Sequence, residues 1–86
     1  MKPQELLILA LLAKQNPDTF VFKRSKINDA AHALGFHSPA DYHGLLDNHK
    51  IYRGYYEFSD DLLESDEVRV LLDQVADIEI AHIKTR

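Results

Sequence analysis

The apolar positions near the start of the chain run almost without interruption. Residues 6–13 form an unbroken apolar stretch, with Pro3 shortly before it and Asn16-Pro17 after it. Proline is tolerated in the first turn of a helix, and a proline beyond the apolar run ends one. The pattern predicts a helix from residue 3 to about residue 14 that is apolar nearly all round. Such a helix has to be covered on more than one side, either by the rest of the chain or by a second copy.

The pattern then changes to that of a strand followed by a helix. Residues 19–22 (Thr-Phe-Val-Phe) are β-branched and aromatic and follow a turn, which predicts a short strand. Ser25 is typical of a helix N-cap, and Gly35 supplies the left-handed position that ends a helix, so that Phe36 can fold back on the last turn. Between them, four apolar residues have the i, i+3, i+4, i+7 spacing of one helix face: Ile27, Ala30, Ala31 and Leu34.

A second helix is predicted almost immediately afterwards. Ser38-Pro39-Ala40-Asp41 gives an N-cap, a first-turn proline and an acid at the third position. The helix that it opens would place on one face Tyr42, Leu45, Leu46 and His49. Two short helices joined by the turn Gly35-Phe36-His37 are typical of a helix-turn-helix, and the helix at residues 6–13 is the candidate to fill the hollow between them.

Residues 51–58 (Ile-Tyr-Arg-Gly-Tyr-Tyr-Glu-Phe) are rich in strand formers, with a turn or bulge at Gly54. Pairing with residues 20–22 would make a small sheet, or wing. We therefore expect a mostly α fold with a small β-sheet, a winged helix-turn-helix-like single domain over residues 1–86. Residues 20–58 would form the helix-turn-helix and wing.

The last third, residues 60–84, is an acidic segment that we expect to be helical at least in part. Length favours a helix for residues 66–76, whereas residues 77–84 fit a helix or a strand. Apolar residues of this segment and of the first helix would supply core and dimer contacts: Leu6, Leu7, Leu9, Leu11, Val68, Leu71, Leu72 and Val75.

The short length and the composition of the chain indicate that its fold needs additional stabilisation. A chain of 86 residues buries only about 60% of its unfolded surface, and without cysteine it has no disulfide or thiolate-bound zinc. Oligomerisation is the remaining common route, so we expect a homodimer. Eight consecutive apolar residues are too few to span a bilayer, and no Ala-x-Ala cleavage site follows them. We expect a cytoplasmic protein with no membrane partner.

The net charge of −4 is unevenly distributed. Residues 59–86 carry eight acids and three bases, whereas residues 14–58 carry six bases and five acids together with four of the five histidines. A uniformly acidic protein repels nucleic acid, but here the acid is concentrated in the C-terminal third.

The sequence contains no pattern that is typical of a catalytic or metal-binding site. His32, His37, His43 and His49 are five or six residues apart, whereas helical metal ligands usually lie three or four apart. No phosphate-binding glycine loop or serine elbow motif is present. We expect no enzyme activity, no metal and no cofactor, with His37 in the turn and His49 as a half-buried packing residue.

Nucleic-acid binding has more support. The second helix of a helix-turn-helix enters the major groove, and its outward positions here would include His43, Gly44 and Asn48, the glycine permitting close approach. Asp41 and Asp47 would also face outward and disfavour phosphate. Cations flank both helices, and Tyr52 and Tyr55 add hydroxyls. The predicted nucleic-acid-binding residues are Lys23, Arg24, Lys26, His43, Asn48, Lys50 and Arg53.

Part of this region resembles a known family. The motif Ala30-Ala31-x-x-Leu34-Gly35, preceded by Ser25 and followed by Gly54-Tyr55 and Phe58, is similar to the modular helix-turn-helix DNA-binding repeat found beside homing endonucleases. Residues 33–38 are also similar to arabinose-regulator-type activators. The resemblance covers residues 20–58 and implies a helix-turn-helix scaffold with possible contact to double-stranded DNA.

The function that we expect is a small DNA-binding transcription regulator of bacterial or phage origin, acting as a dimer. The alternative is a protein-interaction module, such as a small phage-encoded inhibitor that binds a host protein through the same scaffold. The negative net charge and the two aspartates on the second helix favour this alternative.

Overall fold

A computed structural model describes residues 1–78 of the chain, which form a mixed α/β structure. Five α-helices, one 3₁₀ turn and three strands follow in the order α1 (Pro3–Gln15), β1 (Val21–Lys23), α2 (Arg24–Ala33), η1 (Pro39–Asp41), α3 (His43–Asn48), β2 (Lys50–Tyr52), β3 (Tyr55–Glu57), α4 (Asp60–Leu63) and α5 (Asp66–Arg69).

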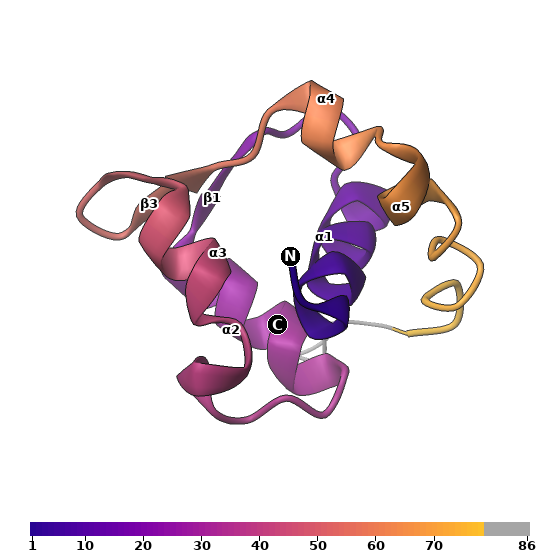
Figure 1. The fold of residues 1–86 in the computed structure, drawn as a ribbon, viewed down its shortest axis with the longest axis horizontal. Coiled ribbons are helices and arrows are strands. Elements are labelled where there is room, and N and C mark those ends of the chain that lie inside the picture. The colour runs from indigo at the N-terminus through magenta and orange to yellow at the C-terminus, as the bar shows by residue number, and fades with distance from the viewer. Residues whose placement is uncertain (79–86) are drawn as a thin grey trace, which may run out of the picture.

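Helix α1 is the centre of the structure, and the rest of the chain covers it. It contacts α2, α4 and α5, with α5 lying directly beside it (Figure 1). The five residues 8–12 are completely buried, which explains why the sequence is apolar all round there. Its first turn is closed by Glu5, whose Oε1 accepts a hydrogen bond of 3.0 Å from the Lys2 backbone N–H. The predicted helix is therefore confirmed, and intrachain packing covers its residues 8–12.

Helix α2 ends as predicted. Gly35 has φ of 92°, a left-handed conformation that glycine adopts without strain. The Gly35 N–H donates to His32 O at 3.0 Å and the Phe36 N–H to Ala31 O at 2.8 Å, which is the Schellman pattern of a helix C-terminus. The predicted cap at the other end is wrong: the helix begins at Arg24, and Ser25 lies inside its first turn.

The second helix of the pair is shorter than expected. Ser38 does act as a cap, accepting from the Ala40 N–H at 3.3 Å, but the turn that it opens is η1. The helical conformation is interrupted at Tyr42, whose φ of −142° is not helical, and α3 begins only at His43. Tyr42, Leu45 and Leu46 still face the core.

The three strands form one antiparallel sheet in the order β1-β3-β2. Phe22 is paired with Tyr56, and the Phe58 N–H donates to Phe20 O at 2.9 Å beyond the end of the ladder. The predicted pairing of the two segments is thus confirmed, with β1 shifted to residues 21–23. Gly54, with φ of 78°, makes the turn between β2 and β3.

The acidic C-terminal segment differs most from the expectation. The predicted helix at residues 66–76 ends at Arg69, and turns follow to residue 77. Hydrogen bonds from the side chains of Lys14 to Ala76 O (2.6 Å) and of Gln15 to Ile78 O (3.1 Å) hold this turn region against α1. Asp77 and Ile78 are in neither helix nor strand, and residues 79–84 lie outside the described residues.

Candidate nucleic-acid interface

The start of α2 is joined to the β2–β3 turn by a backbone hydrogen bond. The Arg24 N–H donates to Gly54 O at 3.0 Å, and Lys23 is paired with Tyr55 in the sheet. Residues that are 30 positions apart in the sequence therefore lie together. The side chains of Lys23, Arg24 and Arg53 are all exposed.

The first turn of α2 carries no negative charge of its own. Its N-cap residue, Lys23, makes no side-chain cap hydrogen bond, and the first turn contains no acidic residue. The positive end of the helix dipole and the cations of Arg24 and Lys26 thus act in the same place. This arrangement favours an anion, and Lys26 is half-buried while Arg24 is exposed.

Helix α3 presents two of the predicted base-reading residues to solvent. His43 and Asn48, at its two ends, are exposed, and Lys50 follows on β2, also exposed. His43 Nδ1 lies 3.2 Å from Ala40 O and donates to it when protonated. Asp47 is exposed on the same helix, so a carboxylate accompanies these groups.

The prediction that Gly44 faces outward is wrong. A Cβ atom at this position would meet Glu5 Oε2 at 2.5 Å, so Gly44 is turned toward α1. Asp41, expected on the outer face of the second helix, lies in η1 before α3 begins. The six-residue α3 therefore presents fewer outward-facing residues than the sequence indicated.

The buried Tyr42 links the start of α3 to α2. Its hydroxyl donates to Asn28 Oδ1 at 3.0 Å, and the side chain is only 1% exposed. Burial raises the pKa of Tyr42; the nearby positive charge of Arg24 opposes that change, and Asp41 adds to it. Arg24 is therefore electrostatically coupled to the start of α3 as well as bonded to the β2–β3 turn.

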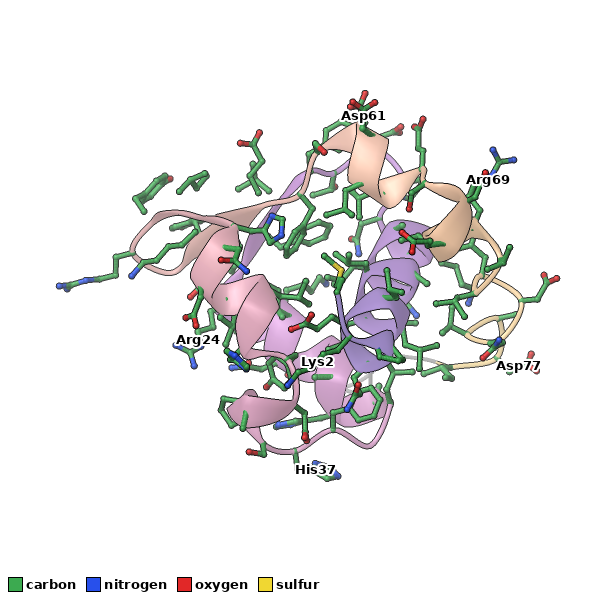
Figure 2. The ribbon with its side chains drawn as sticks, in the orientation of Figure 1. Lys2, Arg24, His37, Asp61, Arg69 and Asp77 are labelled. Atoms are coloured by element: carbon green, nitrogen blue, oxygen red, sulfur yellow. The ribbon has the colours of Figure 1, made fainter. Side chains whose placement is uncertain are left out.

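The acidic segment lies away from this surface. Figure 2 shows Arg24 on the left of the molecule, whereas Asp61 is at the top and Asp77 at the lower right. The exposed carboxylates of α4 and α5 are Asp60, Asp61, Asp66 and Glu67. Charge separation by region, which the sequence indicated, is thus also separation in space.

Two features of the surface were not predicted. The Tyr52 and Tyr55 rings contact one another, with centroids 4.7 Å apart, and Tyr52 is 60% exposed. Lys2 is a further exposed cation and lies beside η1, with Nζ 3.4 Å from Ala40 O (Figure 2). No local pattern links Lys2 to a residue 38 positions later, so only the tertiary structure reveals it.

The histidines have structural surroundings. His37 lies in the predicted turn, with its ring centroid 5.2 Å from that of His32, and His49 is half-buried, with its ring centroid 5.0 Å from that of Phe58. Among residues 1–78, no three His, Cys, Asp or Glu side chains are grouped as a metal site would need. Over the same residues, no helix is both long enough and apolar enough to cross a bilayer.

Comparisons with protein-family models, with curated proteins and with solved structures yield no match for this chain.

Proposed function

We propose that the protein is a winged helix-turn-helix DNA-binding regulator. The observation that carries the proposal is the hydrogen bond from the Arg24 N–H to Gly54 O, which sets the basic start of α2 beside the β2–β3 turn. The element order from α1 to β3, with strands in the order β1-β3-β2, supports a wing that follows two helices. Helices α2 and α3 are joined by a glycine turn, as in a helix-turn-helix.

In this proposal α3 lies in the major groove and the cations around it contact the DNA backbone. Asn48 is suited to adenine, because an amide donates and accepts at once, and His43 supplies a second hydrogen-bonding side chain. Phosphate contacts come from both sides of α3: Lys23, Arg24, Lys26, Lys50 and Arg53. These contacts supply affinity and position without reading sequence.

The test measures binding to a mixed-sequence DNA duplex by fluorescence anisotropy at several salt concentrations. Affinity should fall steeply as salt rises from about 50 to 200 mM, because bound phosphates release counterions. Lys26→Glu and Arg53→Glu should weaken binding on every sequence, whereas Arg69→Glu, a matched reversal on α5, should not. Equal affinity in all three variants, or no dependence on salt, would reject the proposal.

We also propose that the protein acts as a homodimer through a groove between α1 and α5. The groove is lined mainly by Pro3, Leu6, Leu7, Val70 and Leu71. Val70 is 70% exposed at its edge, so each copy offers both an apolar ridge and an apolar groove to the other. A twofold axis requires such self-complementarity. Sedimentation should show that the parent protein is a dimer and that Val70→Asp is a monomer. If the parent protein sediments as a monomer, the proposed dimer is rejected.

The competing function, a module that binds a protein, is favoured by the exposed carboxylates of α4 and α5 and by Asp47 on α3. It predicts no DNA binding at low salt, together with capture of one basic protein partner. Charge reversal at Asp60 and Asp61 should then abolish capture, while Arg53→Glu leaves it intact.

A further inference from the structure

A pocket of about 280 Å³ lies at the end of α1 that is near α4 and α5. Its walls come from the C-terminal turn of α1, the loop to β1, and the two short helices. The apolar part is formed by Ala13, Pro17, Phe20, Leu63 and Leu72. Phe20 is 38% exposed and Leu63 only 7%, so one wall is open to solvent and the other belongs to the core.

Three charged side chains also line this pocket. Lys14 comes from the last turn of α1, Glu64 follows α4, and Arg69 is at the end of α5, from which it extends outward (Figure 2). Within residues 1–78 none of the three is in an ion pair; Lys14 Nζ donates to Ala76 O and keeps its other N–H groups for a ligand. An apolar surface with a few polar groups at its edge is the usual character of a small-molecule site.

The signs of these charges restrict the ligand. Two cations and one carboxylate are complementary to a molecule that carries both an anionic and a cationic group. A carboxylate would pair with the Arg69 guanidinium, which is suited to bidentate contact, or with Lys14. An ammonium group would pair with Glu64. A simple fatty acid would leave Glu64 without a partner, and a simple amine would leave both cations without one.

We propose that this pocket binds an α-amino acid with an apolar side chain. The side chain lies on Phe20, Leu63 and Leu72, the carboxylate faces Arg69 and Lys14, and the ammonium group faces Glu64. The site lies across the molecule from the Arg24 side of the structure, near the labelled Arg69 (Figure 2). The proposal does not depend on DNA binding, because none of the pocket residues belongs to the candidate interface.

Three probes with the same branched apolar body separate the contributions: L-leucine, 4-methylpentanoate, which lacks the ammonium group, and 3-methylbutylamine, which lacks the carboxylate. Binding to the full chain is followed by titration with NMR chemical-shift detection. Leucine should bind with a Kd on the order of 1 mM, as its small size and the open pocket allow, and should shift the Phe20, Leu63 and Leu72 signals. The other two probes should bind at least about tenfold more weakly, equivalent to the loss of one charged contact.

Arg69→Gln and Glu64→Gln are the test variants, because both residues are exposed and their replacement leaves the core intact. Each should weaken leucine binding about tenfold or more, whereas Arg53→Gln, the matched control in the β2–β3 turn, should leave it unchanged. Equal binding of all three probes, an unchanged leucine affinity in both test variants, or no shift at about 20 mM leucine would overturn the proposal.

Discussion

The buried carboxylate of Glu5 lies directly against the backbone of Gly44, where it joins the first turn of α1 to α3. Glu5 is 4% exposed, and its Oε1 accepts from the Lys2 N–H. Its Oε2 is buried and has no hydrogen-bond partner among the described residues. A Cβ atom at position 44 would stand 2.5 Å from this oxygen, so the Glu5 carboxylate occupies this position only because residue 44 has no side chain.

The first prediction is that Gly44→Ala changes sign with the residue at position 5. In the parent protein it should lower the free energy of unfolding by about 1–3 kcal/mol, the usual cost of overpacking. In a Glu5→Ala background it should raise that free energy by about 0.5–1 kcal/mol, because alanine is the better helix former. Urea denaturation of the four proteins in the cycle measures the coupling.

Gly35→Ala is the control for this cycle. Gly35 has a positive φ and no atom within 4 Å of an added Cβ, so its cost is backbone strain alone. It should lose about 1–2 kcal/mol with either residue at position 5. Additive effects of Gly44→Ala and Glu5→Ala would contradict the contact between the two residues.

The second prediction concerns Tyr42 and alkaline pH. Burial raises its pKa above the ordinary value of 10.0, so the folded protein holds the phenolic proton more tightly than the unfolded chain does. The stability that this proton contributes is fully present below pH 10 and is lost as pH rises from about 10 through the folded-state pKa. Tyr42→Phe should therefore reduce the fall in unfolding free energy as the pH rises above about 10.

The same variant removes the hydrogen bond to Asn28, so at pH 7 it should cost about 0.5–1.5 kcal/mol. Tyr52→Phe, at an exposed position, is the matched control and should change neither the stability at pH 7 nor its alkaline loss. Identical pH profiles for the parent protein and Tyr42→Phe would show that this tyrosine is not protected in the folded state.

The third prediction concerns Phe58, which closes the sheet onto the core. It is 0% exposed, with ring centroids 5.9 Å from Phe22 and 5.0 Å from His49. Phe58→Ala should cost about 3–5 kcal/mol, a large part of the roughly 5–10 kcal/mol that stabilises a domain of this size. Thermal unfolding followed by circular dichroism should show the loss, with Phe58→Leu clearly milder. A loss below about 1 kcal/mol in the alanine variant would contradict full burial.

The fourth prediction rests on the proposed DNA binding. Neutralising one phosphate contact should lower the slope of log affinity against log salt by about one. Arg53→Gln should do so, because Arg53 is exposed in the β2–β3 turn. Arg69→Gln, on α5, should leave the slope unchanged. An equal effect of both variants would mean that charge acts through the whole molecule rather than at the proposed surface.

Local signals in the sequence predicted the elements that depend on local interactions. Gly35 and Phe36 end α2 as expected, because the left-handed turn and its two hydrogen bonds involve only neighbouring residues. The pairing of β1 with β3 was also predicted, since few other strand-forming segments exist in the chain. The predicted cap at Ser25 was wrong, because pairing of Lys23 in the sheet and the bond from Arg24 to Gly54 start the helix two residues earlier.

The candidate surface was predicted less well. The cations flanking α2 were identified from the sequence, yet their position beside the β2–β3 turn follows from a contact 30 residues away. Gly44 was expected on the outer face because helical spacing gives the relative positions of residues on a helix, not the rotation of that helix against its neighbours. The helix predicted after Asp66 was too long, because its apolar stripe fits a regular helix as well as the turns that pack on α1.

The sequence by itself thus determined the extent of α1, the end of α2, which residues are apolar enough to form the core, and that acid is concentrated in the last third of the chain. These are properties of neighbouring residues and of composition. Only the tertiary structure decided that Gly44 faces Glu5, that Arg24 lies beside Gly54, and that the acids lie away from Arg24. Each of these depends on how distant segments pack, and packing is decided by the shapes and partners of all the buried residues together.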